Sequence, residues 1–101
     1  MDVTIKFVGP VAIKLKKDEA RVECHPGTKV EDIFRILIEK LGEEFSETVF
    51  EKDLRKVKES ISIALKREGQ LGYQRLEVIG GMGTELHPND ALILYHPMGG
   101  G

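Results

Sequence analysis

The residues best suited to chemistry stand at the C-terminus, where an apolar run is followed by Met98, Gly99, Gly100 and Gly101. Glycine has no side chain, so these residues add almost nothing to a core, but they can enter a passage too narrow for a Cβ atom. An extended chain from Pro97 to Gly101 reaches about 17 Å, at about 3.4 Å per residue. Such a segment can deliver its terminal carboxylate into the active site of another protein. A frayed chain end is the alternative that the glycines alone leave open.

The other candidate sites in the sequence carry weaker signals. The run Gly80–Gly83 shares only its glycines with a phosphate-binding loop, because neither a lysine nor a helix pattern follows it, and it is interpreted as a tight turn. The single cysteine, Cys24, falls on the apolar phase of a predicted strand and is interpreted as a buried thiol. Three histidines stand beside prolines in turns and lack the helical spacing of a zinc pair: His25, His87 and His96. The sequence therefore predicts no metal site and no catalytic site of its own.

Composition and charge limit the classes of protein to which this chain can belong. The 101 residues suffice for one domain with a single core, and the formal net charge is −2 with a pI near 5.9. A nucleic-acid partner is disfavoured, because the basic cluster at 14–17 is followed at once by Asp18 and Glu19 and contains no aromatic residue. A single cysteine excludes an intramolecular disulfide, and no apolar run approaches the roughly 18 residues of a membrane span. We expect a cytoplasmic protein that does not bind membranes.

The clearest helical pattern lies between residues 28 and 42. Thr28 and Glu31 have the spacing of a capping box, and Gly42 can end the helix with a positive φ. A second, shorter helix is predicted to start near Ser46, on a thinner apolar stripe. The stripe of the first helix consists of Val30, Ile33, Phe34, Leu37, Ile38 and Leu41, and that of the second of Phe45, Val49, Phe50, Leu54 and Val57.

Several short segments alternate apolar and polar residues, as half-buried strands do. The segment 60–65 also fits a helical stripe, but the β-branched Ile61 and Ile63 favour a strand. The predicted strands are 3–7, a less regular 11–15, 20–24, 60–65, a short one around Leu76 and Val78, and 91–95. An apolar helix among such strands packs most simply across a sheet, which predicts the α+β class.

This order of elements, the run from Gly80 to Pro97 and the terminal glycines resemble the ubiquitin-like sulfur carriers of the MoaD/ThiS type, most closely MoaD, the small subunit of molybdopterin synthase. The matching positions, which cover about the last quarter of the chain, are Thr84, Leu86, Asp90, the strand 91–95, Pro97 and the final glycines. Three departures are present. Asn89-Asp90 replaces a Gly-Asp turn, His96-Pro97 followed by Met98 replaces a Pro-Pro stem, and the terminus has a third glycine.

The resemblance implies a β-grasp, ubiquitin-like domain over residues 1–97, with an amphipathic helix across a mixed sheet, and a flexible glycine tail at 98–101. It implies that Gly101 is the reactive residue, whose carboxylate is adenylated and converted to a thiocarboxylate for sulfur transfer in molybdopterin synthesis. ATP and Mg²⁺ would be used by a ubiquitin-activating-type adenylating enzyme, and the molybdopterin synthase large subunit would receive the sulfur. The residues expected to contact these partners are Tyr95, Pro97, Met98, Gly99 and Gly100.

Two other functions stay open at this point. A ubiquitin-like modifier would use the same activation to form isopeptide bonds with lysines. A β-grasp domain that binds a partner without conjugation would have no use for its glycines. The sequence also leaves open whether the sulfur goes to molybdopterin, to thiamine or to tRNA, because the surface of the partner decides the pathway.

Overall fold

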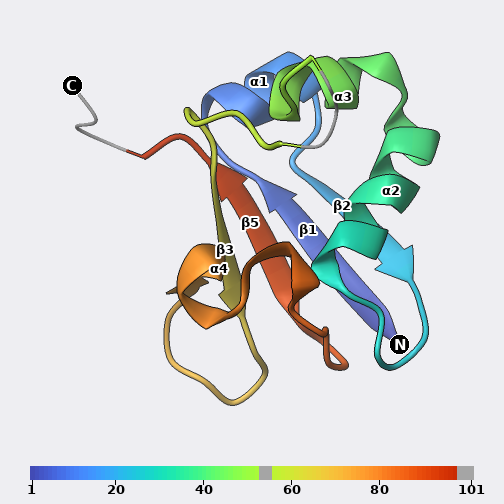
Figure 1. Ribbon diagram of the computed structural model, residues 1–101, viewed down its shortest axis with the longest axis vertical. Helices are drawn as coiled ribbons and strands as arrows, with labels where there is room; N and C mark the ends of the chain where they lie inside the picture. Colours follow the sequence, from blue (N-terminus) through green and yellow to red (C-terminus); the bar gives the residue numbers. More distant parts are fainter. Residues whose placement is uncertain (53–55, 98–101) are drawn as a thin grey trace.

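The computed structural model describes residues 1–52 and 56–97, in which a mixed sheet of five strands lies behind a layer of helices (Figure 1). The strand order is β2-β1-β5-β3-β4, with β1 and β5 parallel and the other pairs antiparallel. The strands are β1 (Asp2–Phe7), β2 (Glu19–Glu23), β3 (Ser62–Lys66), β4 (Gln74–Arg75) and β5 (Ala91–Tyr95). The helices are α1 (Pro10–Leu15), α2 (Val30–Leu41), α3 (Glu43–Val49), α4 (Leu76–Ile79) and the 3-10 turn η1 (Gly81–Gly83). The predicted α+β class and β-grasp sheet are confirmed.

Helix α2 crosses the sheet and buries the predicted stripe. Its residues Val30, Ile33, Phe34 and Leu37 are almost fully buried, in the core cluster that also contains inward-facing residues of β1 and β5. Gly42 has a positive φ of 73°, and its N–H donates a hydrogen bond to the carbonyl of Ile38 at 2.9 Å. The predicted end of the helix at Gly42 is therefore confirmed.

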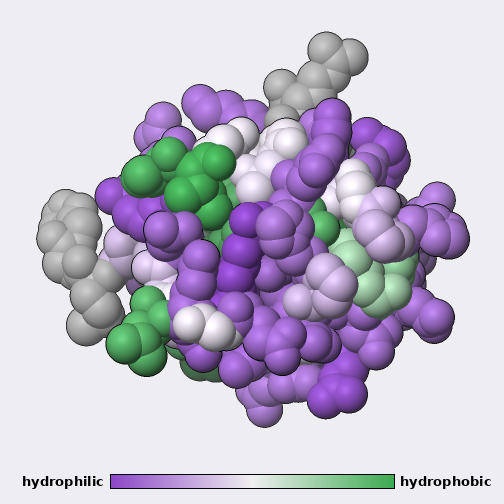
Figure 2. Space-filling view, turned by 90° about the horizontal axis from the view of Figure 1, so that it is seen from below, coloured by the Kyte–Doolittle hydropathy of each residue, from purple (hydrophilic) through white to green (hydrophobic). Residues whose placement is uncertain are grey.

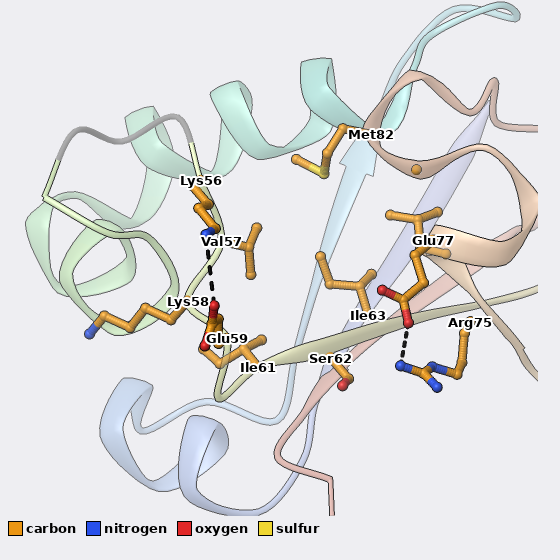
Figure 3. Close-up of a pocket in the computed structure, with 12 residues that line it drawn as sticks. Lys56, Val57, Lys58, Glu59, Ile61, Ser62, Ile63, Arg75, Glu77 and Met82 are labelled. Atoms are coloured by element: carbon orange, nitrogen blue, oxygen red, sulfur yellow. Dashed lines mark ion pairs between the residues drawn. The ribbon is translucent and has the colours of Figure 1, made fainter.

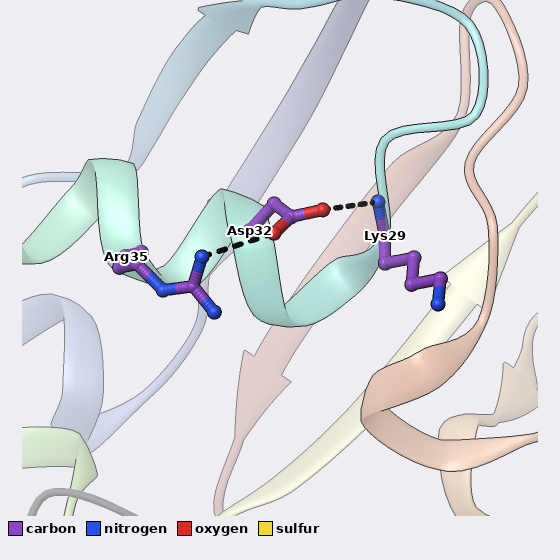
Figure 4. Close-up of polar contacts among 3 residues, drawn as sticks. All are labelled: Lys29, Asp32 and Arg35. Carbon is purple, nitrogen blue, oxygen red and sulfur yellow. Dashed lines mark hydrogen bonds and ion pairs between the residues drawn. The ribbon is translucent and has the colours of Figure 1, made fainter.

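The predicted capping box at Thr28 and Glu31 is wrong by one residue. Instead, Asp32 Oδ2 accepts a hydrogen bond from the backbone N–H of Lys29 at 3.0 Å (Figure 4). The other carboxylate oxygen of Asp32 accepts one from Arg35 at 3.2 Å. The reason lies in the backbone before the helix. The carbonyl of Thr28 accepts from Leu86 N–H at 2.8 Å, and this extended pairing delays the first helical turn until Val30.

All four phenylalanines of the chain meet beneath α2 and α3. Phe45 lies at the centre, with its ring centroid 6.1 to 6.4 Å from those of Phe7, Phe34 and Phe50. Phe45 belongs to α3, which starts at Glu43 directly after Gly42, three residues before the predicted start near Ser46. Leu54, the next member of the predicted stripe, lies outside the described residues.

The segment predicted as a strand at 11–15 is instead helix α1. Pro10 at the first turn fixes a helical φ, and Gly9 with a φ of 66° turns the chain away from β1. Only Val11 is fully buried, whereas Ile13 is 76% exposed. Because Val11 and Leu15 are four residues apart, they also fit one face of a helix, and five residues are too few to separate the two periods.

The strand predicted around Leu76 and Val78 is likewise wrong. Strand β4 covers only Gln74–Arg75, and Leu76–Ile79 form the one-turn helix α4. Leu76 is buried and Ile79 packs on the core one turn later, whereas Val78 is 75% exposed.

The glycine run after α4 is a turn, as interpreted from the sequence. Gly80 has a φ of 138°, and a Cβ atom there would lie 2.8 Å from Thr84 Oγ1. Thr84 Oγ1 donates a hydrogen bond to the carbonyl of Gly81 at 2.7 Å and closes the turn. No helix of phosphate-loop type follows, because the chain passes directly into the segment that pairs with Thr28.

A buried carboxylate holds the turn from which β5 starts. Asp90 Oδ2 accepts a hydrogen bond from the N–H of His87 at 2.7 Å and lies 3.5 Å from Arg67 Nε. The side chain of Asp90 is fully buried and that of Arg67 is 27% exposed. Arg67 also donates to the carbonyl of Glu85 at 2.7 Å, and Asn89 takes a left-handed φ of 66°, which asparagine tolerates better than most residues. The end of β3 is therefore tied to the start of β5.

The centre of the phenylalanine cluster should dominate stability. Phe45→Ala is expected to lower the free energy of unfolding by about 3 to 5 kcal/mol, because it leaves a cavity among three rings. Urea unfolding followed by circular dichroism measures this. Leu71→Ala, a matched truncation at a fully exposed position, should change it by less than about 0.5 kcal/mol. Equal effects of the two variants would contradict the described core.

Asp90→Ala should lower the free energy of unfolding by about 2 to 3 kcal/mol, since it removes the carboxylate that pairs with the partly buried cation of Arg67 and leaves the N–H of His87 without its acceptor. A double-mutant cycle with Arg67→Ala should show a favourable coupling energy in the same urea measurement. The exposed ion pair of Arg75 and Glu77 is the control, and its cycle should give a coupling below about 0.5 kcal/mol.

Candidate functional site

The candidate site is the C-terminal end of β5, from which the chain leaves the sheet. Strand β5 lies between β1 and β3 and pairs with both along its length. Leu92 and Leu94 point into the core and are fully buried. A strand that is paired on both edges and buried on one face is rigid, so its last residue has a fixed position.

Two backbone contacts define where the strand ends. The N–H of Val8, just beyond β1, donates to the carbonyl of Leu94 at 3.0 Å. On the other side, Tyr95 is the cross-strand partner of Ser62, the first residue of β3. His96 is partly exposed and Pro97 is exposed, so the chain leaves the sheet directly after Tyr95 (Figure 1).

Only some of the predicted site residues, those up to Pro97, lie among the described residues. Tyr95 and Pro97 lie at the exit as expected from the sequence. Met98, Gly99, Gly100 and the reactive Gly101 lie outside the described residues. Their roles, and the division of the chain into a domain and a tail at residue 97, stay predictions.

The exposed face of the sheet continues from the exit. Because cross-strand partners share a face, the register places Ile93 and Tyr95 on the side away from the core, where both are partly exposed. Ala64 and Lys6 flank Ile93, and Ser62 flanks Tyr95. A partner that grips the tail would meet this mixed apolar and polar strip next.

The opposite end of the molecule has a different surface. Figure 2 views that end, which carries the β3–β4 loop, and shows a mostly hydrophilic surface with apolar residues in separate areas. Exposed apolar residues here include Leu71 in the loop and Val78 in α4. Single exposed apolar side chains are common on soluble domains and indicate no site by themselves.

Sequence reasoning missed three residues around the exit. The alternation of 91–95 could have identified Ile93 as the partner of Tyr95 on one face. Val8 and Ser62 could not be found in this way, because they reach the exit only through the order of the strands.

Few side chains among the described residues are arranged for metal binding or catalysis. Within 1–52 and 56–97, no three side chains of His, Cys, Asp or Glu gather closely enough to hold a metal ion. Cys24 is partly buried at the end of β2, and His25 and His87 are exposed in turns. In that same part of the chain, the helices are too short or too polar to span a membrane.

Comparison with known proteins identifies the fold. No protein-family model matches the sequence, and no curated protein matches it at a significant level. The solution structure of small archaeal modifier protein 1 from Methanosarcina acetivorans is similar, with a TM-score of 0.74, 21% identity, and coverage of 99% of this chain and 96% of that chain. Urm1 from Trypanosoma brucei gives a TM-score of 0.73 at 16% identity, over 99% of this chain and 95% of that chain.

A protein from Pyrococcus furiosus assigned as subunit 1 of molybdopterin converting factor gives a TM-score of 0.56 at 19% identity, over 97% of this chain and 99% of that chain. At these identities the likeness establishes the fold. The resemblance stated from the sequence is thus confirmed at that level, and the chain has the β-grasp, ubiquitin-like fold found in sulfur carriers of the MoaD/ThiS type.

Proposed function

We propose that this chain is a sulfur carrier, whose Gly101 carboxylate is adenylated and converted to a thiocarboxylate for molybdopterin synthesis. The observation that carries the proposal is the combination of a rigid central strand that ends at Tyr95 and the sequence Met98-Gly-Gly-Gly that follows it. The β-grasp fold supports the same conclusion.

The chemistry follows from the state of the carboxylate. A chain-terminal carboxylate is ionised at neutral pH and is a poor electrophile. One of its oxygens attacks the α-phosphate of ATP in an adenylating partner, which forms an acyl adenylate and releases pyrophosphate. The terminal sulfur of a persulfide on a partner then attacks the acyl carbon and displaces AMP, which forms an acyl disulfide. A thiol reduces this disulfide by forming a new disulfide with the partner's sulfur, and the thiocarboxylate is released. ATP and Mg²⁺ belong to the partner in this scheme.

The contribution of this chain is to position its terminal carboxylate for the partner. The contacts of Tyr95 with β3 and of Leu94 with Val8 fix the root of the tail, and Pro97 limits the directions in which it can leave. Glycines then allow the carboxylate to enter a narrow active site, where reacting atoms must approach within about 3 to 3.5 Å. The partly exposed Ile93 and Tyr95 are proposed to contact the partner beside its entrance.

Two similar solved structures are complexes with a partner protein. One contains subunits 1 and 2 of molybdopterin-converting factor from Helicobacter pylori, with a TM-score of 0.54 and 20% identity. The other is the BexX/CysO complex from Amycolatopsis orientalis, with a TM-score of 0.67 and 15% identity. They support a partner enzyme for this chain, for which we propose an adenylating enzyme and the large subunit of molybdopterin synthase.

A protein modifier is the second candidate. It is favoured by the higher TM-score to small archaeal modifier protein 1, 0.74, than to the molybdopterin converting subunit, 0.56. In this case a lysine amine of a target protein, in place of sulfur, displaces the activating group from Gly101 and forms an isopeptide bond.

Loading with sulfur distinguishes these functions. Incubation with the adenylating enzyme from the same genome, ATP, Mg²⁺, a persulfide donor and a thiol reductant should increase the intact mass by the difference between sulfur and oxygen. A mass that stays unmodified contradicts the sulfur carrier. Reductant-resistant conjugates to lysines that depend on Gly101 would instead establish the modifier.

Removal of Gly101 alone tests the third glycine. If the partner measures distance from Tyr95, the shortened chain should load at least about tenfold more slowly, because its carboxylate is misplaced by one residue. Mass spectrometry at fixed times gives the loading rate. Leu71→Ser, far from the exit, should load at the normal rate, and equal loading of all three chains would show that the third glycine has no role in recognition.

A further inference from the structure

The segment that contains α1 carries positive charge without a compensating acid. Between Val3 and Lys17 the sequence has no aspartate or glutamate, although the whole chain has a net charge of −2. Lys14 lies in the last turn of α1, Lys16 and Lys17 follow it, and all three are exposed. In residues 1–52 and 56–97, none of the ion pairs includes one of these lysines.

Elsewhere on the surface, charges of opposite sign are paired. Figure 3 shows a groove beside β3, whose rim carries the ion pairs of Lys56 with Glu59 and of Arg75 with Glu77. Helix α3 packs beside α1 and begins with two glutamates, but none of its carboxylates pairs with the lysines of α1. The lysines at the end of α1 therefore present their charge to solvent.

The end of α1 has a backbone conformation that glycine usually supplies. Lys16 has a φ of 55° and a ψ of 39°. Its N–H donates to the carbonyl of Ile13 at 3.3 Å, and the N–H of Lys17 donates to that of Ala12 at 3.2 Å. This is the Schellman pattern, in which a Cβ atom at the left-handed position costs free energy. The helix dipole favours a cation near this end but does not require one at that position, so folding alone does not explain Lys16.

Helix α1 lies beside the point where the tail leaves the sheet. Gly9 joins it to Val8, whose N–H donates to the carbonyl of Leu94, and α1 also contacts β5. Figure 1 shows α1 at the end of the sheet where β5 ends. A standard protein–protein interface covers about 800 Å² of each partner, a patch roughly 30 Å across. The six residues of α1 span only about 9 Å, so a partner that covers the exit also covers α1.

Exposed apolar side chains accompany the lysines. Val8 is 49% exposed and Ile13 is 76% exposed. The N–H of Ile13 donates to the carbonyl of Gly9 at 3.2 Å, which places Ile13 one turn beyond the exit. Tyr95 is partly exposed and Pro97 is exposed at the exit itself. Apolar side chains with charged residues around them are typical of protein–protein interfaces, in which the charges speed association and the apolar contacts add affinity.

We propose that the α1 surface, formed by Val8, Ile13, Lys14, Lys16 and Lys17, binds an acidic region of the adenylating enzyme. This inference rests on the proposed function, from which it takes the partner. The adenylating enzyme is needed by both candidate functions, because sulfur transfer and isopeptide formation each start from the activated carboxylate. The lysine ammonium groups pair with carboxylates of the enzyme, and the two apolar side chains are buried against it.

Other partners fit this surface less well. A nucleic acid would require stacking platforms, but no aromatic residue lies between Val8 and Lys17, and Asp18 and Glu19 follow at once. A membrane would require a broad apolar face, whereas Ile13 is the only strongly exposed large apolar residue of α1. An acidic protein surface matches both the lysines and the small apolar area.

The test measures binding of the full chain to the adenylating enzyme from the same genome, by isothermal titration calorimetry without ATP. The charge-removed variant combines Lys14→Gln, Lys16→Gly and Lys17→Gln. Its Kd should be about tenfold higher than that of the unmodified chain at about 50 mM salt. At about 500 mM salt, which screens the lysines, the two chains should differ by less than about threefold. Glycine suits the left-handed position, and circular dichroism with urea unfolding establishes that the variant is folded.

The matched control removes the same charge from α2 and from the far end of β3, through Lys29→Gln, Arg35→Gln and Lys66→Gln. It should bind as the unmodified chain does. Arginine at all three positions of the charge-removed variant keeps the charge and should restore the affinity. Ile13→Ser should raise the Kd by about fivefold at both salt concentrations, because salt does not screen apolar burial.

Four outcomes would overturn the proposal. They are no binding to the adenylating enzyme, unchanged binding of the charge-removed variant, an equal loss in the matched control, and a loss that is the same at both salt concentrations. Binding of an oligonucleotide or of anionic lipid vesicles that depends on these lysines, while enzyme binding does not, would assign the surface to that ligand instead.

The intact mass after loading separates this inference from the proposed function. A chain that binds the enzyme through the lysines but gains no sulfur would support the α1 surface and contradict the sulfur carrier. A charge-removed variant that binds normally and gains sulfur at the normal rate would support the sulfur carrier and contradict the α1 surface.

Discussion

The parallel ladder between β1 and β5 is the interaction on which the rest of the structure depends. It joins residues almost ninety positions apart, from Thr4 and Ala91 to Phe7 and Leu94, and places the last strand in the middle of the sheet. Between these two strands in the sequence, α2 and Phe45 of α3 supply apolar surface to the core. The position of the end of β5 is thus determined by contacts that span the domain.

Patterns that extend over several turns or several alternations were predictable from the sequence. The stripe of α2, the alternation of β1 and β5, and the turn at Asn89 and Asp90 each combine many residues or a specific backbone need. The structure of short segments was not predictable. Val11–Leu15 and Leu76–Ile79 fit both the helical and the strand period, and only tertiary contacts decide between them. The residue that caps α2 is Asp32 and not Glu31 because Thr28 pairs with Leu86. This is a tertiary contact, which the local sequence does not indicate.

The candidate site also contains some residues that the sequence indicates and others that it does not. The terminal glycines and Pro97 could be singled out because their types are unusual after an apolar strand; Pro97 lies at the exit, and the role of the glycines stays a prediction. The neighbours of the exit, Val8 and Ser62, come from strands far apart in the sequence, and the topology alone brings them together.

The pairing of β5 on both edges has a mechanical consequence. Force applied to Pro97 along the strand would load the ladders with β1 and β3 together, in shear, because their hydrogen bonds lie across the direction of pull. Bonds loaded in this way share the force, whereas an edge strand that is peeled away loses them one at a time. If a partner enzyme draws the tail into its active site, as proposed, it can therefore pull against a domain that holds its shape.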